Sequence, residues 1–148
     1  MIKFVIAWIG AVGMMTLFSN IIYRISHREV REPILLAWLL KNYRAPNKPV
    51  FVPRAKGWLL HFAIGLVFMS LFMGLWMFLG KDASMRWGGI IGAIFGLLGI
   101  FGWALLFYLH PQKPKIDFKL FYLQLFLAHI IFGLTAAGLL ELISFFEK

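Results

Sequence analysis

The sequence predicts an all-α integral membrane protein, a bundle of four transmembrane helices with a short cytoplasmic interfacial helix between the first two. Three observations lead to this fold class. Of the 148 residues, 61% are hydrophobic and only 14% are charged, and the mean hydropathy is +0.83, whereas soluble domains are about half apolar and a quarter charged. Four apolar runs approach the length of about 20 residues that crosses a bilayer core. Positive charge is concentrated in two of the connections between these runs.

The four apolar runs cover about residues 4–23, 57–79, 88–109 and 120–146. The segments between them are too short to form a soluble domain with its own core. We therefore expect a single transmembrane domain, 1–148, and we expect any activity to lie within the bundle or at its surface. The first run has no basic leader and no small-residue cleavage site, so we interpret it as a retained span.

The basic residues indicate how the bundle is oriented. Residues 24–56 and the connection between the third and fourth runs are rich in Lys and Arg, whereas the turn between the second and third runs has only Lys81 and Arg86. By the positive-inside rule, the two basic connections are cytoplasmic and both termini lie outside. The net charge of +9 then indicates attraction to the bilayer and its anionic lipids rather than to nucleic acid.

The first run carries small residues on one face and polar residues toward its cytoplasmic end. Thr16 and Asn20 are four residues apart and therefore share a helix face. We expect Asn20 to point inward and to form a hydrogen bond with a neighbouring helix, as polar side chains commonly do in membranes.

A short apolar segment between the first two runs, residues 33–43, is flanked by charge and is too short to span. Pro33 suits a first helical turn, and Glu29 and Glu32 lie near the positive end of the helix dipole. We predict an interfacial helix on the cytoplasmic leaflet, with Trp38 at headgroup depth. The prolines at 46, 49 and 53 predict an extended chain after it.

The third run is unusually rich in glycine. Wound as a helix, it places five glycines on one face and Gly89 at the edge of that face. The five are Gly88, Gly92, Gly96, Gly99 and Gly102. Such a face lets two helix backbones approach closely in a bilayer, so we predict helix packing here. The bulky residues of the other side are then expected to face lipid: Ile90, Ile91, Ile94, Leu97, Leu98 and Phe101.

The second and fourth runs share the phrase His-x-x-x-Gly-Leu, starting at His61 and at His129. The first and third runs also share a short glycine-containing phrase in the same order. These matches predict a pseudo-repeat of two hairpins about an axis along the membrane normal. Both histidines are then expected at one depth inside the bundle, with Gly65 and Gly133 level and available for packing.

His61 and His129 support three hypotheses. In the first, each imidazole is structural and forms a hydrogen bond across helices with Thr16, Asn20 or Gln124. In the second, the histidines take part in proton or ion movement, as ionisable residues in membranes often do. In the third, both ligate haem b, and the glycines one turn later make room for the porphyrin.

Motifs of common enzymes are not found: there is no HExxH, no phosphate-binding glycine loop and no Gly-x-Ser-x-Gly. There is also no cysteine, which excludes disulfides, thiol nucleophiles and iron–sulfur clusters. We expect no catalytic residues and no metal site other than the haem alternative.

The order of motifs resembles a broad group of small, four-span, largely uncharacterised bacterial inner-membrane proteins. The motifs are a Gly-rich first helix with Met-Met-Thr, then Gly-Trp-x-x-His-Phe-x-x-Gly, a glycine-laddered third helix and Ala-His-x-x-Phe-Gly. The resemblance covers most of the chain. It implies a four-helix fold in the bacterial inner membrane, with His61 and His129 as recurrent polar positions, and it implies no activity.

From these observations we expect a small inner-membrane protein that acts as an accessory subunit or as an oligomeric channel- or transport-like component. Four thin helices hardly enclose a pore, so we expect a protein partner or a homo-oligomer in contact with the bilayer. The alternative is a haem b- or quinone-associated membrane component that uses His61 and His129.

Overall fold

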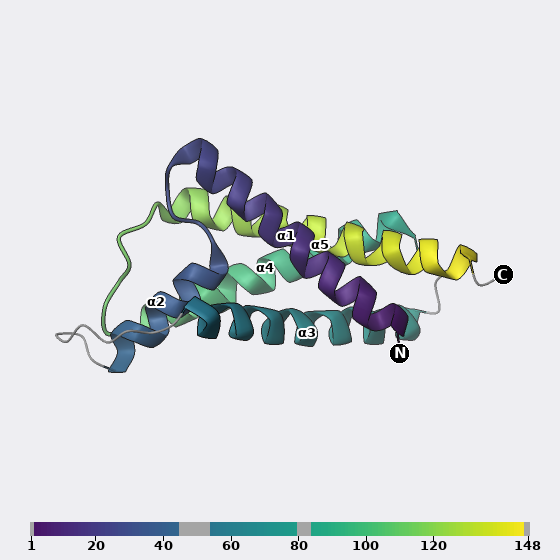
Figure 1. Ribbon diagram of the computed structural model, residues 1–148, viewed down its shortest axis with the longest axis horizontal. Helices are drawn as coiled ribbons and strands as arrows, with labels where there is room; N and C mark the ends of the chain where they lie inside the picture. Colours follow the sequence, from purple (N-terminus) through teal and green to yellow (C-terminus); the bar gives the residue numbers. More distant parts are fainter. Residues whose placement is uncertain (1, 45–53, 80–83, 147–148) are drawn as a thin grey trace.

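The computed structural model describes residues 2–44, 54–79 and 84–146, and all regular structure within these ranges is helical. In chain order the helices are α1 (Ile2–Ser26), α2 (Glu32–Arg44), α3 (Arg54–Leu79), α4 (Met85–Leu109) and α5 (Phe118–Phe146), as Figure 1 shows. The extended segment expected at Pro46, Pro49 and Pro53 lies outside the described residues.

Four of these helices, α1, α3, α4 and α5, are long and apolar enough to cross a membrane. The predicted fold class, an all-α bundle with four membrane-spanning helices, is therefore confirmed. Each of these four helices extends two or three residues beyond at least one of the bounds expected from hydropathy, because hydropathy does not register the polar ends of a helix.

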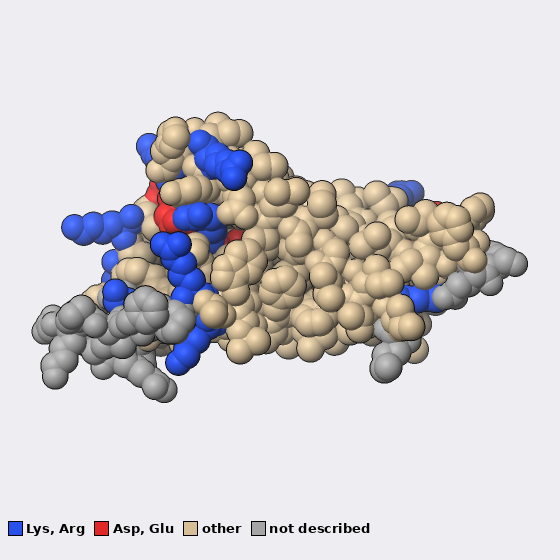
Figure 2. Space-filling view, viewed as in Figure 1, with Lys and Arg blue, Asp and Glu red and all other residues tan. Residues whose placement is uncertain are grey.

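Successive membrane-spanning helices run in opposite directions, so the two ends of the chain lie at one end of the bundle (Figure 1). The connection that contains α2 and the connection between α4 and α5 lie at the other end. Lys and Arg side chains gather around this α2 end (Figure 2). The bundle therefore has one strongly basic end and a long apolar body.

The hairpin of α4 and α5 is packed backbone against backbone. A Cβ atom added at Gly88 would lie 2.6 Å from the carbonyl oxygen of Gly133, and one added at Gly92 would lie 2.5 Å from that of His129. On α5, a Cβ added at Gly133 would collide with the Gly88 carbonyl oxygen. Only glycine allows the two helices this separation.

The glycine face of α4 no longer contacts the α5 backbone toward the α2 end. A Cβ added at Gly99 would lie 2.9 Å from Cε1 of the His129 ring, whereas one added at Gly102 would meet nothing within 4 Å. Gly88, Gly92 and Gly96 therefore pack against α5, while Gly102 borders open space. This open space belongs to a cavity described below.

Most bulky residues on the opposite side of α4 are exposed on the surface of the bundle, as a lipid-facing side requires. Leu97 is 62% exposed and Phe101 is 69% exposed. Ile91 is an exception to the expected lipid-facing set, because it is only 3% exposed and belongs to the core. It lies at the border of the glycine face, next to Gly92, and is covered when α4 approaches its neighbours.

The hairpin of α1 and α3 is packed differently from that of α4 and α5. Helix α1 packs mainly against α5 and makes few contacts with α3, and α3 is held mainly by α2. Gly65 of α3 meets the side chains of Val12 and Trp8 rather than a backbone, and Trp8 Nε1 donates a hydrogen bond to the Phe62 carbonyl oxygen at 3.2 Å. The hairpin pseudo-repeat expected from the sequence does not extend to helix packing.

Helix α2 closes the basic end of the bundle. Its apolar residues Leu35, Leu36 and Leu39 are buried, and Gly57 lets the start of α3 approach it, since a Cβ there would lie 2.8 Å from the Ala37 Cβ. The Leu39 carbonyl oxygen lies 3.1 Å from Nε2 of His110, the residue that ends α4. Helix α2 is therefore part of the core at this end, in addition to any contact it makes with a membrane surface.

Candidate functional site

A buried carboxyl group lies at the start of α2. The Glu32 side chain is only 1% exposed. Ser19 Oγ of α1 donates a hydrogen bond to Glu32 Oε2 at 2.8 Å, and Gln124 Nε2 of α5 donates to Glu32 Oε1 at 3.1 Å. Gln124 Nε2 also lies 2.6 Å from Ser19 Oγ. This polar cluster, Ser19, Glu32 and Gln124, joins three helices.

The local sequence brings Glu32 back to α1. Helix α1 ends at a left-handed residue, His27, whose φ is 54° and whose N–H bonds to the Tyr23 carbonyl oxygen. Five residues later α2 begins at Glu32, with Pro33 in its first turn, where a missing N–H is tolerated. The short return allows Ser19 and Glu32, 13 residues apart, to meet.

Among the described residues, no Lys or Arg forms an ion pair with Glu32. The neighbouring Arg31 instead pairs with Glu29: Arg31 Nη2 lies 2.6 Å from Glu29 Oε2. The Arg31 guanidinium also lies over the Tyr23 ring. Burial therefore raises the pKa of Glu32, despite hydrogen bonds from its own backbone, Gln124 and Ser19 that favour the charged form. Within the described ranges, Glu32 is therefore a buried acid without a cationic partner.

The Gln124 side chain is only 2% exposed, and its Oε1 has no hydrogen-bond partner among the described residues. The amide uses its Nε2 for both Ser19 and Glu32. A buried acceptor without a partner is uncommon. The polar cluster therefore has unused capacity to accept a hydrogen bond.

His61 connects α3 to α1. Its Nε2 lies 3.0 Å from Thr16 Oγ1, and Thr16 Oγ1 donates its single hydrogen to the Val12 carbonyl oxygen at 2.7 Å. The imidazole must therefore donate to the hydroxyl oxygen, which places its proton on Nε2. Thr16 is thus the cross-helix partner of His61, one of the partners considered in the structural hypothesis.

His129 has a different partner from the one expected. Its Nδ1 lies 2.8 Å from the carbonyl oxygen of Leu125 in its own helix, so this bond does not cross helices. Nδ1 carries the proton in this arrangement, and Nε2 is left as an acceptor. The ring contacts Phe68 of α3, with centroids 5.3 Å apart, and Phe68 lies about two turns, roughly 10 Å, beyond His61 along α3.

The polar residues singled out in the sequence do not all meet. Thr16, His61, Gln124 and His129 are buried. Asn20 is only half-buried, and its side chain makes no hydrogen bond within the described parts of the chain. The neighbouring residue, Ser19, takes the inward position instead.

Two site residues, Ser19 and Glu32, were not identified from the sequence as site residues. Ser19 is three positions from Thr16 and therefore also lies on its helix face. Glu32 stands out as an acid in a basic segment, directly before Pro33 and an apolar stretch. Both features can be found in the sequence, but an acid at the start of a helix is also explained by the helix dipole alone.

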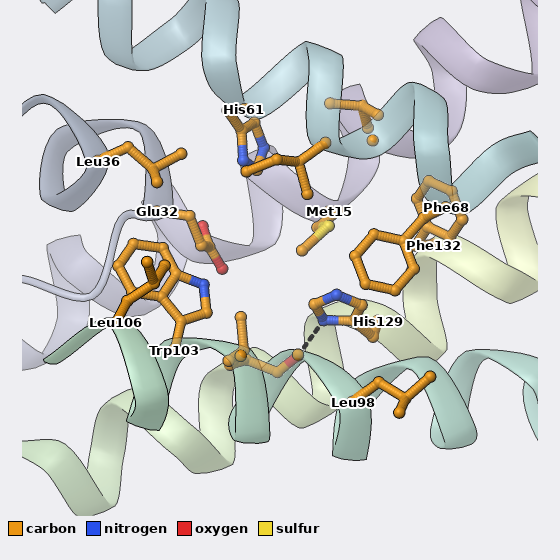
Figure 3. A pocket seen from close by; sticks show the side chains of 16 residues that line it. Met15, Glu32, Leu36, His61, Phe68, Leu98, Trp103, Leu106, His129 and Phe132 are labelled. Carbon is orange, nitrogen blue, oxygen red and sulfur yellow. Dashed lines mark hydrogen bonds between the residues drawn. The ribbon is translucent and has the colours of Figure 1, made fainter. Parts of the chain in front are cut away.

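A cavity of about 170 Å³ lies between α3 and the α4–α5 hairpin. Glu32, His61 and His129 reach it from three different elements, and Figure 3 shows them around a space with Phe68 and Phe132 at one end. The rest of the lining is apolar apart from Trp103 Nε1. We call this space the α3–α4 cavity.

The α3–α4 cavity opens toward the side of the bundle. Three of its lining residues on α3 and α4 are also partly exposed on the surface: Ile64 at 37%, Leu98 at 52% and Leu106 at 44%. Helices α3 and α4 make few backbone contacts with each other. A molecule dissolved in a bilayer could therefore enter between them.

The residues present fit haem poorly. Nε2 of His61 is already used by Thr16, and the cavity of about 170 Å³ is smaller than the pockets of about 300–1,000 Å³ that hold cofactors and drug-sized ligands. Within the described ranges, no three His, Asp or Glu side chains are close enough to hold a metal ion. The cavity is better matched to a small apolar molecule.

No protein-family model, no curated protein and no solved structure matches this chain.

Proposed function

We propose that this chain is a multi-pass protein of the bacterial inner membrane that acts as a non-catalytic accessory component, with a protein partner or as a homo-oligomer. The observation that supports this proposal is the placement of the buried polar side chains. They gather near the α2 end, where the polar cluster and the His61–Thr16 bond tie α1, α2, α3 and α5 together. Such groups stabilise a membrane fold through hydrogen bonds between helices.

The same placement argues against a pore through a single chain. Toward the α3–α4 turn the described core is formed by apolar residues such as Met69, Phe72, Ala136 and Ala137, and α4 and α5 are in backbone contact there. An apolar, closely packed segment of this kind offers no groups that would hydrate an ion along a path through the chain. A channel function would therefore require a path between chains rather than within one.

Gentle native purification followed by mass spectrometry tests the accessory role. We expect the protein to co-purify with a second membrane protein or with further copies of itself, in stoichiometric amount. A monomer without partners in a mild detergent and in native nanodiscs would contradict the proposal. The visible spectrum of the same sample tests the haem alternative, which predicts a Soret band.

We propose further that the basic α2 end faces the cytoplasm and contacts anionic lipid, with both termini outside. Because the chain has no cysteine, single cysteines report topology directly. A cysteine replacing Lys113 should resist an impermeant thiol reagent added outside, and one replacing Asp82 should react. The reverse labelling pattern would overturn this orientation.

A further inference from the structure

We propose that the α3–α4 cavity binds a small lipophilic cation, an amine or quaternary ammonium with one apolar or aromatic group, and that its positive charge lies on the Glu32 carboxylate. This inference does not depend on the accessory role proposed above. It rests on the charge, the shape and the opening of the cavity.

The charge of the site is incomplete without a ligand. Glu32 is nearly fully buried, and its partners Ser19 and Gln124 are neutral. A buried carboxylate without a cation is unfavourable and takes up a proton instead, in agreement with the raised pKa of Glu32. A bound cation would supply the missing partner and allow the carboxyl group to ionise.

None of the groups that face Glu32 in the part of the chain that the structure describes supplies that cation. Glu29, in the connection before α2, adds a negative charge and is paired with Arg31. His61 on α3 and His129 on α5 line the cavity as neutral rings in the hydrogen-bonding arrangements described above. The residues that α1 and α4 contribute to the cavity carry no charge.

The acceptors and aromatic faces of the cavity fit an organic cation. Nε2 of His129 is an acceptor at the cavity, and Trp103 lies beside Glu32, with Phe68 and Phe132 at the far end (Figure 3). Aromatic faces attract ammonium groups.

The size of the cavity sets the size of the ligand. Its volume of about 170 Å³ is similar to that of engineered apolar cavities of about 150 Å³ that bind benzene. Gly102 keeps this space open, because no atom lies within 4 Å of the position of its missing Cβ. The lateral opening beside Leu98 and Leu106 suits a molecule that partitions into the bilayer before it binds.

Binding is coupled to release of one proton. Without ligand, burial raises the pKa of Glu32 and thereby favours its protonated, neutral form. When a cation binds, the proton leaves Glu32 for the solvent, and the resulting carboxylate pairs with the cation. The net charge of the site stays the same, so affinity should rise with pH and each cation bound should release up to one proton.

Isothermal titration calorimetry with benzyltrimethylammonium, on the purified chain in nanodiscs of zwitterionic lipid, tests the proposal. This cation has no proton to lose, so any pH dependence reports on the protein. We expect tighter binding at pH 8 than at pH 6, and a buffer-dependent enthalpy that reveals proton release. Neopentylbenzene, the uncharged molecule of the same shape, should bind at least about tenfold more weakly.

Two pairs of variants locate the site. Glu32→Gln keeps the hydrogen-bonding side chain and should weaken binding at least about tenfold, whereas Glu29→Gln, which removes a neighbouring acid outside the cavity, should weaken binding much less. Gly102→Leu should fill the cavity and abolish binding. Gly74→Leu is its control, because a Cβ there also meets nothing within 4 Å and Gly74 does not line the cavity.

Three results would overturn the proposal. One is no binding of benzyltrimethylammonium at millimolar concentration to protein that melts cooperatively. Another is equal affinity for neopentylbenzene, which would make the cavity merely apolar. The third is unchanged affinity of the Glu32→Gln variant, which would place the cation elsewhere.

Discussion

The two hairpins of this molecule are built from similar motifs and packed in opposite ways. In the α4–α5 hairpin, Gly133 meets the backbone of Gly88 and Gly92. In the α1–α3 hairpin, the corresponding residue, Gly65, meets the side chains of Val12 and Trp8. A glycine therefore brings two membrane helices together only when the facing helix also offers a small residue.

The cavity is a consequence of this difference. Helices α4 and α5 approach to backbone contact, whereas α3 is held at its start by α2 and has few contacts with α1. The space that α3 leaves is lined by Gly99 and Gly102, two glycines of α4 that do not touch the α5 backbone. The α4–α5 hairpin leaves no space between its helices, whereas the looser packing of α3 leaves the α3–α4 cavity.

The sharpest test of this comparison is the same substitution in each hairpin. Gly92→Leu should destabilise the bundle by about 3 kcal/mol or more, because its side chain would have to displace the backbone of α5. Gly65→Leu in α3 should cost less, because the Cβ there would meet Cγ2 at the end of the Val12 side chain rather than the backbone of a neighbouring helix. Thermal unfolding in detergent measures both, and equal effects would mean that the hairpins do not differ in packing.

A second test concerns the acid that joins α2 to the bundle. Because the folded-state pKa of Glu32 is raised above its ordinary value of 4.5, the folded state holds a proton that the unfolded state loses. The contribution of Glu32 to the free energy of unfolding is fully present below the pKa that Glu32 has in the unfolded state. It is lost as the pH rises toward the pKa of Glu32 in the folded state, by at most about 1.4 kcal/mol per pH unit.

The variant Glu32→Gln removes this titration. The melting temperature of Glu32→Gln should therefore increase relative to that of the parent as the pH rises from 5 to 8. The melting temperature of Glu29→Gln should show the same pH dependence as that of the parent. Parallel melting curves for the parent and Glu32→Gln across this range would show that Glu32 does not titrate differently in the folded state.

The smallest expected effect is the coupling between Thr16 and His61 in the α1–α3 hairpin. Hydrogen bonds between membrane helices contribute about 0.6 kcal/mol on average. A double-mutant cycle of Thr16→Val and His61→Leu should yield a coupling of about this size. The same cycle with Thr16 and His129 should yield none, because His129 bonds to its own helix.

The sequence predicted the fold well because the signals for it are local. Hydropathy, Pro33 and the glycines of α4 each act within a few residues, and the membrane spans followed from them. The position of Ile91 could not be predicted in this way, because helical periodicity places it at the border of two faces and only the approach of neighbouring helices decides which face is covered.

The site was predicted in part. The face of Thr16 and the inward position of His61 follow from helix periodicity and the polarity of their side chains. The burial of Glu32 does not, because its partner Gln124 is 92 residues away and because a local explanation for the acid, the helix dipole, was sufficient. A cavity is equally inaccessible from sequence, since it depends on where two helices fail to meet.

The long separation between Glu32 and Gln124 has a consequence for how the protein is made. Helix α1 has its main contacts with α5, which follows α3 and α4 in the chain, so α1 leaves the ribosome well before the helix that holds it is synthesised. During this interval Ser19 and Glu32 lack their third partner, and the protonated form of the acid is the one that such surroundings tolerate. Chain synthesis must therefore reach Gln124 before the first half of the protein acquires its final structure, and a chain truncated before α5 is expected to be a substrate for membrane proteases.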